Sequence, residues 1–111
     1  IQTNGSILAT GTAYLGGGNH SNMVLVRYLS DGSYDYSFGN AGIVIKRIDR
    51  YHNDSFAIAL TTKGKIYQAG NVGQSGNRKF AVLRYKSDGS MDSSFGSNGV
   101  VTTNITENQP A

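Results

Sequence analysis

An eighteen-residue segment occurs twice in this chain. It reads RYLSDGSYDYSFGNAGIV from Arg27 to Val44 and RYKSDGSMDSSFGSNGVV from Arg84 to Val101, at a spacing of 57 residues. The similarity continues upstream, where Ser6–Gly11 matches Lys65–Gly70 at a spacing of 59 residues. A repeat of this length indicates one supersecondary unit that is used twice. We therefore divide the chain into a first repeat, residues 1–54, and a second repeat, residues 55–111.

The change in spacing falls in a stretch rich in Gly, Asn and Ser. Thr12–Asn22 in the first repeat stands where the second repeat has Asn71–Lys79. Variation in length within such a composition is typical of surface loops. The repeat is therefore expected to have a constant body and one variable loop, which in the second repeat covers Asn71–Arg78.

The composition indicates β-structure. The chain has 15 Gly and one Pro, and its apolar residues are mostly β-formers, with no helical period. Turn residues divide the second repeat into four predicted strands: Ser55–Leu60, Lys65–Gly70, Lys79–Lys86 and Gly99–Ile105.

The third predicted strand of the second repeat is apolar on both faces. Alternation places Phe80 and Val82 on one face and Ala81, Leu83 and Tyr85 on the other. An antiparallel sheet with one wet face would carry polar residues at every second position. Four-stranded antiparallel sheets stacked face to face, one for each repeat, cover both faces. We therefore expect an all-β fold built from the blades of a β-propeller.

The first repeat is one strand short, because it has no counterpart of the strand that begins at Ser55. Seven strands are expected in all, with an unpaired edge at Ser6–Thr12. Since the chain begins at Ile1, inside the first repeat, we expect it to be a segment of a longer protein; closure of a ring by several copies is the alternative. The expected partners are thus further blades of the same polypeptide or other copies of the chain.

The repeated core resembles that of the delta-60 repeat family. The family carries R-Y-x-x-D-G-S-x-D-x-x-F-G-x-x-G, followed by A-x-A-L-x-x-D-G-K-I-x-x-A-G; the second core here reads AIALTTKGKIYQAG, from Ala57 to Gly70. Thr62-Lys63 stands where the family often has Pro-Asp. The resemblance implies a propeller-like array in a secreted or surface-attached bacterial protein. It implies no common activity and no catalytic residues.

The repeated charged residues point to a structural role. Arg27 and Arg84 lie on otherwise apolar strands, and Asp35 and Asp92 follow them at a fixed spacing of eight residues. A buried Arg needs a partner. We predict one ion pair in each repeat, which joins the long turn to the third strand.

The long turns themselves carry further repeated residues. Asp31 and Asp88 begin Asp-Gly-Ser sequences, in which oxygens at alternate positions are compatible with Ca²⁺. The favoured interpretation is turn chemistry, because a third carboxylate and a bidentate acid are missing from the local sequence. Phe38 and Phe95, each followed by Gly, are predicted to be structural side chains that fill gaps.

Tyrosines that differ between the repeats are the candidate ligand-binding residues, because packing does not require them. They are Tyr14, Tyr34, Tyr36 and Tyr51. In a carbohydrate-binding propeller they would stack on sugars, while Asn19, Asn22, Asn53 or Asp54 would bind hydroxyls. Surface residues without a ligand are the alternative interpretation.

Other functional classes have little support in the sequence. There is no Cys, the net charge of +3 is spread along the chain, and His20 and His52 have no second ligand at metal spacing. No apolar run approaches the length of a membrane span. We expect no metal, no cofactor, no nucleic-acid partner, no membrane insertion and no nucleophile–base pair.

The expected function is a non-catalytic β-propeller segment of a secreted or cell-surface protein, acting as a scaffold or as an interaction module for a protein or glycan. Two alternatives stay open. One is a carbohydrate-binding propeller with sites in the loops between blades. The other is part of an enzyme whose active site lies in blades outside this sequence.

Overall fold

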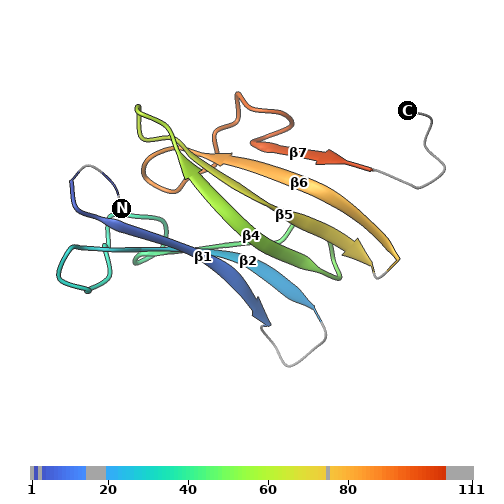
Figure 1. Cartoon of the computed structure of the whole chain (residues 1–111), viewed down its shortest axis with the longest axis horizontal. Helices are drawn as coiled ribbons and strands as arrows, with labels where there is room; N and C mark the ends of the chain where they lie inside the picture. Colours follow the sequence, from blue (N-terminus) through green and yellow to red (C-terminus); the bar gives the residue numbers. More distant parts are fainter. Residues whose placement is uncertain (1, 3, 15–19, 75, 105–111) are drawn as a thin grey trace.

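The computed structural model describes residues 2, 4–14, 20–74 and 76–104, which contain seven β-strands. The first three, β1 (Ile7–Tyr14), β2 (Ser21–Tyr28) and β3 (Ile43–Lys46), form one sheet in that order. The second sheet has the order β4 (Asn53–Leu60), β5 (Ile66–Gln74), β6 (Asn77–Tyr85) and β7 (Val100–Thr103). All pairings are antiparallel, and no described residue lies in a helix (Figure 1). The expected all-β class and the seven strands are confirmed.

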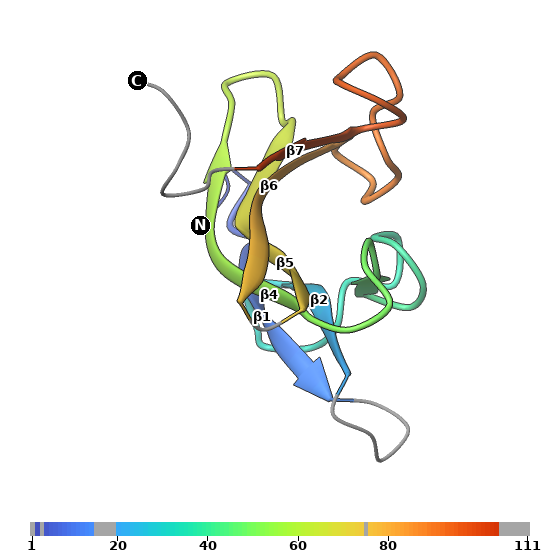
Figure 2. The same ribbon diagram turned by 90° about the vertical axis from the view of Figure 1, so that its right-hand side faces the viewer.

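The two sheets pack against each other, with β4 next to β1 and β2 (Figures 1 and 2). β1 is an edge of the first sheet, and no described strand pairs with its outer side, as expected for Ser6–Thr12. The second sheet starts at Asn53, two residues before the boundary drawn from the repeat.

Both hairpins are longer than the sequence predicted, and the predicted loop Asn71–Arg78 is wrong in extent. β5 continues to Gln74 and β6 begins at Asn77, so that Gly73 pairs with Arg78. In the first sheet the pairing likewise runs on to Tyr14 and Ser21. The polar residues extend the hairpin because they bond across it: Arg78 Nη1 donates to Asn71 Oδ1 at 2.8 Å. Residues 15–19, in the predicted variable loop of the first repeat, lie outside the described residues.

A glycine in β5 is required by the path of β4. The β4–β5 pairing is interrupted by a bulge between Ser55 and Ala57. A Cβ atom built on Gly70 would lie 1.8 Å from the carbonyl oxygen of Asp54. Its counterpart in the first repeat, Gly11, has no heavy atom within 4 Å of the same position. The close approach is therefore found at Gly70, which pairs with β4, and not at Gly11, beside which no described strand pairs with the outer side of β1.

The core lies between the two sheets, and the two repeats contribute different faces of their sheets to it. We call the front face of a unit the one that bears Leu8, Thr10, Met23 and Leu25 in the first unit and Tyr67, Ala69, Phe80 and Val82 in the second. The back face bears Ala9, Val24, Val26 and Tyr28 in the first unit and Gln68, Ala81, Leu83 and Tyr85 in the second.

The front face of the first unit packs on the back face of the second. Met23 and Leu25 on one side, and Leu83 and Tyr85 on the other, are completely buried in one cluster. The counterpart of Met23 is Phe80, which is 59% exposed on the free front face of the second unit. The units are therefore stacked in the same direction, head to tail.

Candidate functional site

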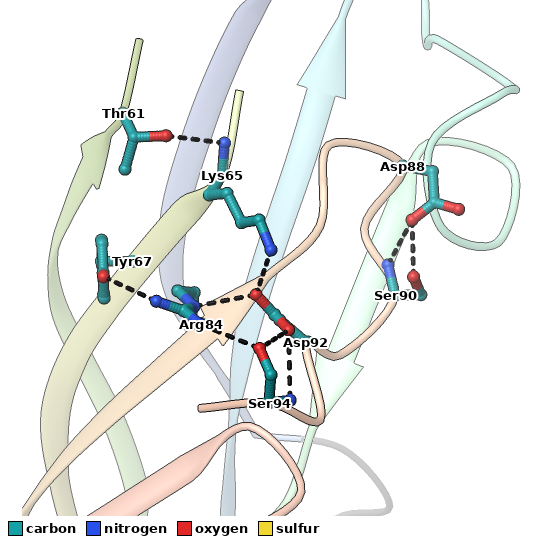
Figure 3. Close-up of polar contacts among 8 residues, drawn as sticks. All are labelled: Thr61, Lys65, Tyr67, Arg84, Asp88, Ser90, Asp92 and Ser94. Carbon is teal, nitrogen blue, oxygen red and sulfur yellow. Dashed lines mark hydrogen bonds and ion pairs between the residues drawn. The ribbon is translucent and has the colours of Figure 1, made fainter. Parts of the chain in front are cut away.

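The structure contains both predicted ion pairs between the third strand of a unit and its long turn. Arg27 Nε donates to Asp35 Oδ2 at 3.0 Å, and Arg84 Nε donates to Asp92 Oδ2 at 2.9 Å (Figure 3). Lys65 Nζ adds a second cation to Asp92, and the first repeat has Ser6 at the corresponding position.

Each arginine also lies against the phenylalanine of its own turn. The guanidinium carbon of Arg27 is 4.5 Å from the ring centroid of Phe38, and that of Arg84 is 4.8 Å from the centroid of Phe95. Cation–π contacts of this kind contribute roughly 0.5–1 kcal/mol at exposed sites and more when they are desolvated. The phenylalanines thus pack on the ion pairs as well as filling space.

The carboxylates that pair with arginine also shape the turns. Asp35 Oδ1 accepts hydrogen bonds from the backbone N–H and the hydroxyl of Ser37, and Asp92 Oδ1 does the same with Ser94. The Lys65 ammonium and the Ser94 hydroxyl hold the pKa of Asp92 well below its usual range. The Ser37 hydroxyl, together with Arg27, lowers the pKa of Asp35. Both groups are carboxylates that hold the turn on the strand at neutral pH.

The Asp-Gly-Ser sequences form turns, as the sequence predicted. Asp31 Oδ1 accepts the N–H and the hydroxyl of Ser33 at 3.0 and 2.7 Å; Asp88 Oδ1 accepts those of Ser90 at 2.9 and 2.6 Å (Figure 3). The serine hydroxyls lower the pKa of both carboxyl groups. Within the described ranges, no three side chains of His, Asp or Glu are grouped so that they could hold a metal ion.

The first unit also contacts the long turn of the second, which the sequence did not predict. Arg27 Nη1 donates to the carbonyl oxygen of Ser87 at 2.8 Å. The backbone N–H of Gly39 donates to the carbonyl oxygen of Asp88, also at 2.8 Å. Phe38 is completely buried at this contact, whereas Phe95 is only half-buried. The same residues that stabilise one turn therefore connect it to the turn of the next unit.

A buried polar chain crosses between the sheets. The Tyr85 hydroxyl donates to Gln68 Oε1 at 2.6 Å, and Gln68 Nε2 donates to Thr10 Oγ1 at 3.0 Å. Thr10 Oγ1 lies 2.6 Å from the hydroxyl of Ser55 on β4. Burial raises the pKa of Tyr85, so its phenol stays protonated and acts as the donor. The repeat comparison did not reveal this chain, because Gln68 has Ala9 as its counterpart.

Two residues proposed to bind sugar hydroxyls are used inside the protein. Asn53 is completely buried, and its amide group donates to the carbonyl oxygens of Ser21 and Asp49. Asp54 accepts hydrogen bonds from the Ser21 hydroxyl at 2.9 Å and from Arg78 at 2.6 Å. Asn53 is therefore corrected to a structural residue, because all its polar atoms are satisfied internally. Asn22 is also buried, and Asn19 lies outside the described residues.

The four candidate tyrosines are not brought together. Tyr14, at the end of β1, and Tyr51 lie near the start of β2, where Ser21 pairs with Tyr14 and donates its N–H to the Tyr51 carbonyl oxygen. Tyr34 and Tyr36 lie in the long turn after the other end of β2. An eight-residue strand is about 26 Å long. A single site cannot use all four.

The individual environments of these tyrosines also differ. Tyr34 stacks on Tyr28 with a centroid distance of 5.6 Å, and Tyr36 is exposed. The rings of Tyr51 and His20 are perpendicular with centroids 5.7 Å apart, and the guanidinium carbon of Arg50 lies 5.2 Å from the Tyr51 ring centroid. The candidate tyrosines therefore form two separate aromatic patches, Tyr14 with Tyr51 and Tyr34 with Tyr36, near opposite ends of β2.

The structure consists of two antiparallel β-sheets with equivalent long turns, and the family comparison assigns this chain to a β-propeller class. The family described as "Domain of unknown function (DUF5122) beta-propeller" matches residues 2–38 and 64–95. The chain belongs to this family, which agrees with the expected propeller-like repeat. No curated protein and no solved structure gives a significant match. Within the described residues, no helix is long and apolar enough to span a membrane.

Proposed function

We propose that this chain is a non-catalytic β-propeller segment that serves as a scaffold or interaction module in a secreted or cell-surface bacterial protein. In this proposal β4–β7 form one four-stranded blade, and β1–β3 form a blade whose first strand is not among the described residues. The head-to-tail stacking of the two units is the observation that carries the proposal. It buries one front face and one back face, and it leaves the corresponding two faces available to neighbouring units.

The use of the recurring polar residues supports a non-catalytic role. Arg27, Asp35, Arg84 and Asp92 pair within their own units, and the Asp-Gly-Ser carboxylates are bonded in their turns. A function performed at these residues would have to break contacts that hold the turns in place. The extracellular location is supported by the resemblance to repeats of secreted and surface-attached proteins.

A glycan array separates this proposal from the carbohydrate-binding alternative. We expect no specific binding of the purified chain. Specific binding that is lost in Tyr36→Ala or Tyr14→Ala, with unchanged circular dichroism, would instead establish a sugar site at one end of the first sheet. Lys63→Ala is a suitable control, because Lys63 is exposed in the turn between β4 and β5 of the second repeat, whereas the candidate tyrosines all belong to the first repeat.

A further inference from the structure

The two units meet through a joint that has two unlike halves. From this joint we infer how a second copy of the chain docks, an inference that rests on the proposed scaffold function. The donor half consists of Arg27, Phe38 and Gly39, and the acceptor half is the turn Ser87-Asp88-Gly89. Two hydrogen bonds of 2.8 Å connect the halves. A Cβ atom on Gly89 would meet Gly39 N at 3.0 Å, and Phe38 Cε1 and Val44 Cγ2 at 3.1 Å. The turn is therefore seated closely on the preceding unit.

The first unit also has a counterpart of the acceptor half, and the second unit has a counterpart of the donor half. Neither counterpart contacts another unit in the described part of the chain, and we call these two halves open. The turn Ser30-Asp31-Gly32 is the counterpart of the acceptor half; Gly32 has φ +92°, close to the +91° of Gly89, yet no atom lies within 4 Å of its Cβ position. The carbonyl oxygens of Ser30 and Asp31 accept no hydrogen bond from any described residue.

The open donor half also has an N–H group without the hydrogen bond that its counterpart makes in the joint. Arg84, Phe95 and Gly96 correspond to the donor residues of the joint, and the N–H of Gly96 donates to no backbone carbonyl of the described residues. Arg84 directs its Nη1 to the Tyr67 hydroxyl at 3.1 Å and remains partly exposed. Among the described residues, the Gly96 N–H and the carbonyl oxygens of Ser30 and Asp31 are thus left without the bonds that their counterparts make in the joint, whereas the Arg84 guanidinium is bonded within its own unit.

The sheet faces beside the open halves are complementary in polarity. At the closed joint, Gln68 on a back face donates to Thr10 on a front face at 3.0 Å. At the open faces the counterparts of both residues are alanines, Ala9 on the back and Ala69 on the front. Had only one of the two positions changed, docking of the open faces would bury an unpaired polar group, which costs about 1–3 kcal/mol. The paired change allows the open back face to fit the open front face.

We propose that the open front face and donor half receive the open back face and acceptor turn of a second copy of this chain, in the head-to-tail arrangement seen inside the chain. The Gly96 N–H would donate to Asp31 O of the second copy, and the Arg84 guanidinium to Ser30 O. Phe80 and Val82 would pack on Val24, Val26 and Tyr28. Such an interface joins unlike surfaces, so successive copies form either a closed ring or an open filament.

Two charged variants test the proposal, because each blocks one face only. Phe80→Glu places a carboxylate on the front face, and Ala9→Glu places one on the back face; both side chains are exposed in the chain, so neither change removes core packing. Thr62→Glu, in the turn between β4 and β5, is the control for added charge. Oligomeric state is measured by sedimentation velocity from micromolar to submillimolar concentration, and folding by circular dichroism.

We expect the wild-type chain and Thr62→Glu to associate, and each face variant alone to be monomeric. An equimolar mixture of Phe80→Glu and Ala9→Glu should form a one-to-one dimer, because each supplies the face that the other lacks. A monomeric wild type, a mixture that stays monomeric while the wild type associates, or association blocked by one variant and not the other would each overturn the proposal. If Phe80→Glu does not fold, Val101→Glu on the same face replaces it.

The glycan array tests the scaffold function and the mixing experiment tests the docking, so either proposal can be refuted without the other. A sugar-binding chain that forms the expected mixed dimer would refute the scaffold function and leave the docking geometry standing. A chain that binds no glycan and forms no mixed dimer would refute the docking alone.

Discussion

The buried hydroxyl of Tyr85 should contribute measurably to stability through one acceptor. In Tyr85→Phe, the ring still fills its place in the core, but Gln68 Oε1 loses the donor that lies 2.6 Å away. Gln68 and Tyr85 are both completely buried, so the freed amide oxygen has no water to replace the bond. A buried polar atom left without a partner costs about 1–3 kcal/mol. For a domain of this size, each kcal/mol lowers Tm by about 4–8 °C.

The repeat supplies a matched control for this substitution. Tyr28 is the counterpart of Tyr85, is only half-buried, and its hydroxyl makes no hydrogen bond to a described residue. Tyr28→Phe should therefore change the free energy of unfolding by less than about 0.5 kcal/mol. Both variants are unfolded by urea and by heat at one fixed protein concentration, since association would make Tm depend on concentration.

A double variant distinguishes an unsatisfied acceptor from lost packing. Gln68→Leu removes the oxygen that Tyr85→Phe leaves without a donor, so Tyr85→Phe should cost much less in a Gln68→Leu background than alone. The coupling between the two changes should be about 0.5–3 kcal/mol. Equal losses for Tyr85→Phe and Tyr28→Phe, or strict additivity in the double variant, would refute the reasoning.

Three further outcomes are expected. Asp92→Ala should lower Tm more than Asp31→Ala, because it leaves the two cations Lys65 and Arg84 facing each other without a carboxylate. The folded-state pKa of Asp92 lies below the ordinary 3.8, so the stabilisation by this carboxylate should be complete above that pH and be lost as the pH falls further. Thermal melts at a series of pH values measure both effects. Gly70→Ala should destabilise by about 1–3 kcal/mol or more, with Gly11→Ala nearly neutral; equal effects in urea titrations would contradict the close approach of β4. Millimolar Ca²⁺ should leave Tm unchanged, and a rise reversed by chelator would show that the Asp-Gly-Ser turns bind the ion.

Much of the fold follows from residues that occur twice. The ion pairs of Arg27 and Arg84 were predictable because a charged residue on an apolar strand needs a partner, and the aspartates recur at one spacing. The β-strands were predictable from runs of β-forming apolar residues that are bounded by turn residues. The extent of the hairpins was not, because Asn71 and Arg78 look like loop residues until their side chains are seen to bond across the strands.

The contacts between the units could not be predicted from the sequence, for two physical reasons. The acceptors of the joint are the carbonyl oxygens of Ser87 and Asp88, and every residue has such an oxygen, so nothing in the sequence marks these two. The chain from Tyr85 through Gln68 to Thr10 depends on residues that occur in one unit only. Comparison of the repeats treats such differences as variation, whereas the structure shows that they compensate each other across the core.

The Gln68–Thr10 hydrogen bond has a consequence for how such repeats diversify. One partner lies on β5 and the other on β1, 58 residues apart in the chain, so neither residue can change freely while the other remains. The two positions must therefore change together, because the contact is shared between neighbouring units. A unit copied to a new position would carry one partner of the contact on its front face and one partner of another contact on its back face. Recently duplicated units should therefore acquire compensating substitutions first at these facing positions, while their turns keep the ancestral sequence.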